Sequence, residues 1–177
     1  TISGFDIALY YSLTNTFGNF NFSLNIAKLE KFKQTAGNDF IKLIEAQESG
    51  VIPKELSISG FSDLLKKDGS PEIQANIKFI WNKGSWGLGL FAKHIGEFYE
   101  SRNRLSDGRL WKVKAYNTIN GHVDYHFNLN SSNSRIRLGI NNIADERAPL
   151  ASDIFGYYFD KHDNLGRYYY IDLSYKF

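Results

Sequence analysis

Long runs in which apolar and polar residues alternate restrict the fold of this chain more than any other feature of its 177 residues. In the first run, Phe5, Ile7 and Leu9 alternate with small or polar residues. Strand side chains point alternately to opposite faces, so a period of two predicts β-strands, whereas a helix repeats about every 3.6 residues. The sequence therefore predicts an all-β, antiparallel chain of about seven strands, at residues 4–13, 20–27, 73–82, 86–92, 111–127, 135–141 and 168–177.

Aromatic residues are frequent, with 14 Phe, 11 Tyr and 3 Trp, beside 15 Gly and only 3 Pro. This composition favours strands over helices. The net charge of +2 argues against a nucleic-acid-binding surface, and the absence of Cys excludes disulfides and thiolate metal sites. No apolar run is long enough for a transmembrane helix. Because the chain starts at Thr1 and contains no Met, we expect a mature or trimmed piece of a longer protein.

The expected connections between strands alternate between short and long. Short turns follow the first, third and fifth strands, and long loops at about 34–70, 97–109 and 145–165 follow the second, fourth and sixth. Transmembrane barrels sort their connections in this way, with tight periplasmic turns and long extracellular loops. We expect residues 34–70 to form one long extracellular loop, with a helical turn or two at 39–46 that Gly50 and Pro53 end.

Alternation alone does not distinguish a soluble sheet from a membrane barrel, because the apolar face is the core of the first and the lipid-facing surface of the second. The length of the strands favours the barrel, since spanning strands need roughly 9–11 residues and soluble strands usually have about 5–6. Aromatic residues also gather near the short turns and the C-terminus, where an interfacial girdle would lie: Phe20, Trp81, Trp86, Tyr125, Phe127, Tyr175 and Phe177.

The last strand, 168–177, has the most firmly defined register. Asp172 and Lys176 lie on its polar face, and a slip of one residue would carry both charges into lipid. The opposite, lipid-facing side carries Tyr169, Ile171, Leu173, Tyr175 and Phe177.

Residues 138–149 read LGINNIADERAP, and residues 166–177 begin with GRYYY and end on Phe177. These two stretches resemble TonB-dependent outer-membrane receptors, whose strand exit reads "GxNNLFD…PP" and whose C-terminus reads "GR-aromatic-aromatic" with a final Phe. The chain departs from this pattern at Ala144, where Phe is usual, and at Leu150, where a second Pro is common. Stretches at 4–6, 17–20 and 81–86 are also similar to the family's barrel, so the resemblance covers nearly the whole chain except the loop around 34–70.

The resemblance implies a barrel of about 22 strands around an N-terminal plug, in the outer membrane of a Gram-negative bacterium. Residues 1–177 would be the C-terminal part of that barrel, with the plug and the earlier strands outside this chain. The implied function is energy-coupled uptake of a scarce nutrient, which would be a ferric siderophore, a vitamin, heme or an oligosaccharide. The implied partners are outer-membrane lipid, the TonB–ExbB–ExbD complex and the barrel-assembly machinery, whose recognition signal would be the five apolar-face residues of 168–177, with Phe177 as anchor.

Two other functions fit the pattern. One is a passive porin-like or structural barrel without energy coupling, and the other is a soluble β-domain that binds glycans through aromatic surfaces. We expect no enzymatic activity, because the sequence has no Ser/His/Asp arrangement, phosphate-binding loop or paired acids.

Candidate binding residues lie mainly in the last long loop. Loop tips commonly carry recognition, so ligand contact is expected at Asp153, Phe155, Tyr157, Tyr158, Phe159 and His162. The alternative is that these aromatic residues only pack against neighbouring loops.

The polar face of the predicted strands offers two further groups. His122, Asp124 and His126 share one face, about 6–7 Å apart per step, and we expect a solvated lumen wall there in preference to a metal site or heme ligation; no metal and no cofactor are predicted. A basic group should also point into the lumen, where we expect it to pair with acidic residues of the plug rather than guide an anionic substrate: Lys78, Lys112, Lys114, Arg135 and Arg137.

Overall fold

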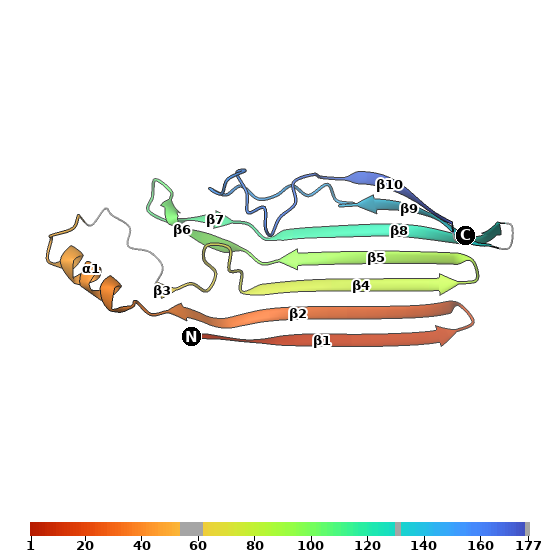
Figure 1. Ribbon diagram of the computed structural model, residues 1–177, viewed down its shortest axis with the longest axis horizontal. Coiled ribbons are helices and arrows are strands. Elements are labelled where there is room, and N and C mark those ends of the chain that lie inside the picture. Colours follow the sequence, from red (N-terminus) through yellow and green to blue (C-terminus); the bar gives the residue numbers. More distant parts are fainter. Residues whose placement is uncertain (54–61, 130–131, 176–177) are drawn as a thin grey trace.

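The computed structural model describes residues 1–53, 62–129 and 132–175, apart from the side chains of residues 62 and 102. Its main element is a sheet of long antiparallel strands that lie side by side in chain order (Figure 1). The strands are β1 (Ile2–Asn15), β2 (Gly18–Gln34), β4 (Ile73–Lys83), β5 (Trp86–Ile95), β8 (Tyr116–Leu129), β9 (Ser132–Asn141) and β10 (Tyr168–Tyr175). The antiparallel all-β fold predicted from the alternation is therefore confirmed.

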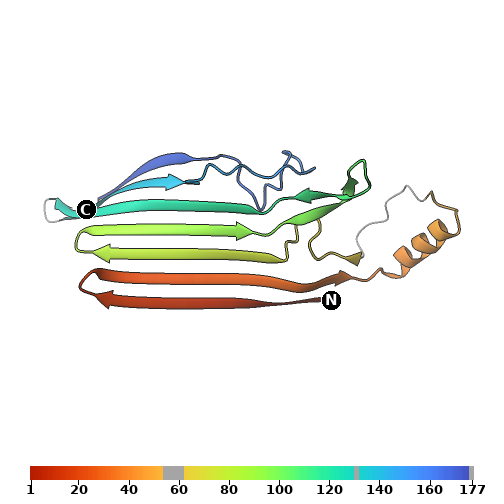
Figure 2. The same cartoon turned by 180° about the vertical axis from the view of Figure 1, so that it is seen from behind.

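Tight turns lie at one end of the sheet and long connections at the other (Figures 1 and 2). At the turn end, Gly18 takes a φ of 127° after β1 and Gly84 a φ of 55° after β4, conformations that glycine adopts readily. In the third turn, Leu129 pairs with Ser132 across two residues outside the described range. The alternation of short and long connections predicted from the sequence is thus present.

The long connections contain structure that the alternation did not predict. Within 34–70, α1 (Asn38–Glu48) is a helix of 11 residues rather than one or two turns, and it has no buried residue. A short strand, β3 (Ser62–Asp63), pairs with the end of β2. Residues 54–61 of the predicted loop lie outside the described residues.

The prediction of one strand over 111–127 was wrong, as was that of a loop over 97–109. Leu110–Val113 forms β7, which pairs with β6 (Phe98–Arg104) in a separate hairpin, and β8 starts only at Tyr116. Apolar and polar residues alternate through both β7 and β8, so the sequence pattern does not reveal the break between them at 114–115.

One face of the long sheet is apolar from edge to edge. The pairing of neighbouring strands places one residue from each strand in a single row: Leu13, Phe20, Trp81, Leu88, Val123, Leu138 and Ile171. This face has no cover among the described residues, and Leu138 and Ile171 are 55% and 69% exposed. The sheet is open, with β1 and β10 as its two edges.

The buried apolar core lies at the long-connection end instead of on this face. Among the described residues it consists of Ile95, Phe98, Val113 and Tyr116, which come from β5, β6, β7 and β8. No helix in the described part of the chain has the length and apolar character needed to cross a membrane. The core therefore holds the connections together, while the sheet presents its two faces outward.

Candidate functional site

The polar face of the sheet carries aromatic rings that lie over glycines of the neighbouring strand. His122 of β8 pairs with Gly89 of β5, and Tyr170 of β10 pairs with Gly139 of β9. A Cβ atom added at either glycine would overlap the ring of its partner. Rings over strand glycines are a known device for filling the space that a missing side chain leaves. The glycines thus allow these two rings to lie flat on the polar face.

Ion pairs cross the polar face near the turn end. Arg137 donates two hydrogen bonds to the Asp124 carboxylate, at 2.6 and 3.0 Å. Arg135 donates to Asp172 at 2.6 Å and to the Ser174 hydroxyl at 3.0 Å. Both arginines therefore have a carboxylate partner on an adjacent strand of this chain, Asp124 for Arg137 and Asp172 for Arg135. Their predicted pairing with acidic residues of a plug stays a prediction.

The other basic residues of the predicted lumen group lie in different places. Lys112 belongs to β7, outside the long sheet, and pairs with Glu97 at 2.6 Å. Lys114 follows β7 and borders a cavity with Trp111 and Arg147. Lys78 alone lies as predicted on the polar face of the long sheet, where its ammonium group sits 6.0 Å from the centre of the Phe91 ring.

The His122, Asp124 and His126 group is only partly brought together. His122 Nε2 lies 3.6 Å from Asp124 Oδ2, but both oxygens of that carboxylate already accept from Arg137. His126 is exposed and pairs in register with Arg135. In the part of the chain that the structure describes, no three His, Cys, Asp or Glu side chains are grouped so as to hold a metal ion.

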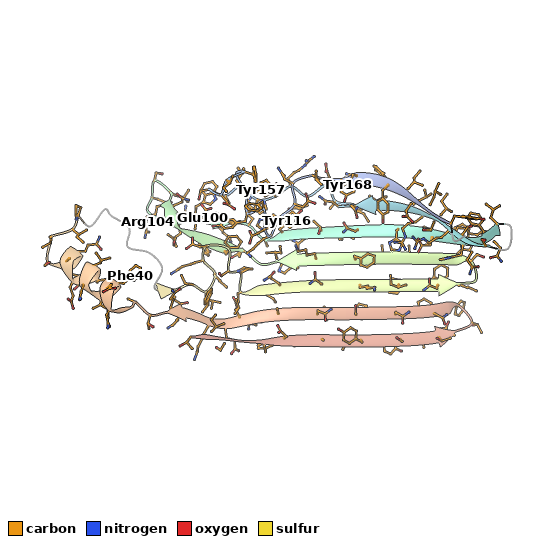
Figure 3. All side chains as sticks on the ribbon, in the orientation of Figure 1. Phe40, Glu100, Arg104, Tyr116, Tyr157 and Tyr168 are labelled. Carbon is orange, nitrogen blue, oxygen red and sulfur yellow. The ribbon has the colours of Figure 1, made fainter. Side chains whose placement is uncertain are left out.

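Two adjoining cavities open on the polar face, one over the middle of the sheet and one beside the connection that follows β9. The first, here called the wall cavity, is about 410 Å³ and is bordered by polar side chains of β2, β4, β5 and β8 together with Phe91. The second, the loop cavity, is about 360 Å³ and lies between β8, β9 and the connection that follows β9. Lys93, Thr118 and Asn120 border both, so the two cavities form one continuous surface. Figure 3 labels Tyr116, at the start of β8, and Tyr168, at the start of β10, both of which border the loop cavity.

The predicted ligand-contact residues of the last loop divide into two groups. Tyr158 and His162 pack inward against Phe98, with ring centres 4.9 and 6.1 Å from it. His162 is only 3% exposed, and neither of its ring nitrogens has a hydrogen-bond partner among the described residues. Burial raises the pKa of Tyr158 to about 12 and lowers that of His162 to about 4, so both side chains are neutral at pH 7.

The second group remains on the surface. Phe155 and Phe159 are 67% and 54% exposed and meet edge to face at 5.7 Å, while Tyr157 lies 6.4 Å from Phe155. Asp153 closes the turn below them, because its carbonyl oxygen accepts from the Gly156 amide at 2.8 Å. Of the predicted set, only Phe159 and His162 border the loop cavity.

Several residues that position this site were not among the predicted ones. Buried Glu100 of β6 accepts from the Ser152 amide at 2.7 Å and from Asn103 at 2.7 Å, which ties the last connection to β6. Tyr116 donates to the Asp163 carbonyl at 2.6 Å, and Lys93 donates to the Lys161 carbonyl at 3.1 Å. No periodic signal marks these contacts, since each joins a strand to a connection distant in sequence.

The two motif stretches of the C-terminal region contact each other. The Asn142 side chain forms hydrogen bonds of 2.7 and 2.9 Å with the Glu146 backbone. The backbone amide of Asn142 donates to the Asn120 side-chain oxygen at 2.7 Å. Asp145 then accepts from the Arg167 amide at 2.8 Å. Asn142 and Asp145 both have positive φ, so the chain turns sharply as it leaves β9. These polar residues therefore join the exit of β9 to the entry of β10.

No protein-family model matches this chain, and no curated protein matches it either. Function is therefore inferred from the sequence patterns and from the geometry described above.

Proposed function

We propose that this chain is the C-terminal part of the barrel of a TonB-dependent outer-membrane receptor, which takes up a scarce nutrient with energy from the inner membrane. The carrying observation is the uncovered apolar row that crosses all the long strands, from Leu13 to Ile171. Each large apolar side chain left in water forgoes about 1.5–3 kcal/mol of burial energy. Lipid around this face would remove that penalty from every row at once.

The sorted connections and the C-terminal motifs support the same proposal. The tight turns that join the long strands lie at one end of the sheet and the long connections at the other (Figure 1), as in barrels with periplasmic turns and extracellular loops. The contacts between Asn142, Asp145 and Arg167 give the family-like motifs a shared structural role. The open edges at β1 and β10 would pair with further strands of a larger barrel, because an unpaired edge invites aggregation.

The test uses the full-length parent protein in a Gram-negative host. We expect it in the outer-membrane fraction, extracted only by detergent, and we expect uptake of one ligand from a panel of ferric siderophores, vitamins, heme and oligosaccharides. A protonophore should abolish that uptake while leaving ligand binding at the surface unchanged. Uptake that persists with the protonophore would indicate a passive porin, and recovery in the detergent-free soluble fraction would exclude a membrane barrel.

A further inference from the structure

The surface that joins the wall cavity and the loop cavity has an unusual combination of side chains. Amide and hydroxyl groups lie there together with lysines and aromatic rings. Asn76 pairs in register with Lys93, which in turn pairs with Thr118, so polar groups lie side by side across three strands. The side chains of Asn76 and Thr118 make no hydrogen bond that is seen among the described residues. They are therefore available to a ligand that offers hydroxyl groups.

Positive charge is concentrated on the same surface. Neither Lys78 nor Lys93 lies within ion-pair distance of a carboxylate in the described parts of the chain: Lys78 faces the Phe91 ring, and Lys93 reaches only the Lys161 carbonyl. Two carboxylates, those of Asp160 and Asp163, also border the loop cavity. The Asp160 carboxylate pairs with Lys161 at 3.0 Å, and Asp163 Oδ1 accepts from the Leu165 amide at 2.9 Å. Two ammonium groups therefore remain for an anionic partner, in contrast with the arginines near the turn end.

Aromatic rings mark the two sides of this surface. Phe91 of β5 is half-buried beside Lys78, and Tyr168 of β10, 43% exposed, borders the loop cavity. The distance across the sheet from β4, which carries Lys78, to β10 is four strand steps, or about 19 Å at roughly 4.8 Å per step. That length suits an oligomeric ligand. The two volumes, about 410 and 360 Å³, are each within the usual range of small-ligand sites.

We propose that this surface binds an oligosaccharide that carries carboxylate groups. Lys78 and Lys93 hold the carboxylates, and Phe91 and Tyr168 contact the apolar faces of the sugar rings. The amides of Asn76, in the wall cavity, and of Asn141, which borders the loop cavity, bond to hydroxyl groups. An apolar ligand would leave the amides without partners, which is costly once water is excluded. A cationic ligand would be repelled by both lysines. The inference rests on the proposed function, because it takes the polar face to line the path of the ligand.

The experiment measures calorimetric binding of a linear trimer of galacturonic acid to the detergent-solubilised full-length parent, with maltotriose as the neutral comparison. We expect the acidic trimer to bind and maltotriose to bind at least about tenfold more weakly. Lys78→Gln and Lys93→Gln should each weaken binding of the acidic trimer about tenfold, the loss expected for one charge-assisted hydrogen bond. Raising the salt concentration should also weaken it, because salt screens the two charges.

The matched control is Lys83→Gln. Lys83 lies on the same strand as Lys78 and also faces a Phe ring, that of Phe17 at 6.0 Å, but it borders neither cavity. This variant should bind the acidic trimer as the unchanged protein does. The inference is overturned if the two trimers bind equally, if the acidic trimer does not bind, or if Lys83→Gln weakens binding as much as Lys93→Gln. If another ligand is then taken up in a protonophore-sensitive way, the proposed function holds and only the inference fails. If no such uptake is found, the inference and the proposed function both fail.

Discussion

At the scale of single residues, the polar face depends on close pairs between neighbouring strands. Tyr170 covers Gly139, and Arg137 holds both oxygens of Asp124. In each pair one residue has the form that the other requires: a glycine beneath a ring, or a fork of donors opposite a carboxylate. Substitutions that spoil the match should therefore cost more than their size suggests.

We expect Gly139→Ala to lower the free energy of unfolding by about 1–3 kcal/mol, because the added Cβ overlaps the Tyr170 ring. Urea unfolding of the full-length parent in detergent micelles measures this loss. Adding Tyr170→Ala should recover part of it by removing the clash. Gly37→Ala is the control, since open space surrounds Gly37. Equal losses in Gly139→Ala with and without Tyr170→Ala would show that the clash is not the cause.

Arg137→Gln should cost on the order of 3 kcal/mol, because it leaves the buried Asp124 carboxylate without its ionic partner. The same unfolding measurement applies. Lys112→Gln removes the exposed pair with Glu97 and should cost less than about 1 kcal/mol. If the two variants lose equal stability, the Asp124 pair contributes no more than a surface pair.

At the scale of elements, the connection between β9 and β10 is held at several points along its length. Glu100 bonds to Ser152, Tyr116 to the Asp163 carbonyl, and the His162 ring packs between Phe98 and Tyr116. The loop cavity lies beneath this connection and depends on its position. A change that loosens these contacts should therefore open the candidate site.

Acid should loosen this connection through His162. Its pKa of about 4 in the folded protein lies below the ordinary value of 6.5, because burial disfavours the charged ring and Lys93 repels it, with Asp160 opposing and Lys161 adding to the shift. His162 binds a proton less readily when the connection is docked than when it is undocked. The contribution of His162 to the stability of docking is therefore complete above pH 6.5 and falls as the pH drops from 6.5 towards 4. Amides of 156–163 should exchange hydrogen faster at pH 5 than at pH 7.5, after correction for intrinsic rates.

Two variants check the source of this pH dependence. His162→Phe keeps a ring in the pocket but cannot be protonated, so it should exchange alike at both pH values. His126→Phe removes an exposed histidine on the polar face and should leave the dependence as it was. An acid response that survives in His162→Phe would assign it to another group.

At the scale of the whole molecule, the two faces of the sheet differ in every strand. Apolar residues on one face stand uncovered, whereas polar residues on the other face line the cavities and form the ion pairs. The small core among β5, β6, β7 and β8 holds only the long-connection end. The sheet itself must therefore draw its stability from strand pairing and from whatever medium covers the apolar face.

A charge should be tolerated on one face and not on the other. Val123→Lys, in the middle of the apolar row, should destabilise the parent protein in lipid vesicles by about 2–4 kcal/mol. Gln74→Lys, on the exposed polar face of β4, should change stability by less than about 0.5 kcal/mol. Shifts in denaturation midpoint measure both. Similar effects of the two substitutions would argue against lipid at the apolar face.

Much of the sheet was predictable from local patterns. The period of two gave the long strands, their two faces and the alternation of short and long connections, because the pleat makes each strand's pattern independent of its neighbours. In β10, Tyr169 and Ile171 face one side and Asp172 the other, as predicted, while Phe177 lies outside the described residues.

The candidate site was much less predictable. Tyr158 and His162 belong to the same aromatic loop as Phe155, and nothing in their spacing tells which ring turns inward against Phe98. The separation of β7 from β8 was hidden in the same way by continuous alternation.

The sequence by itself determined which residues share a strand face and hence that the chain is an antiparallel sheet with one apolar side. The tertiary structure alone decided that Arg137 pairs with Asp124, that Lys78 and Lys93 have no such partner among the described residues, and that the last connection closes over the loop cavity. The physical reason is the distance along the chain over which each property is determined. Side-chain alternation follows from the geometry of a single strand, whereas strand register and loop docking depend on contacts between residues far apart in the chain.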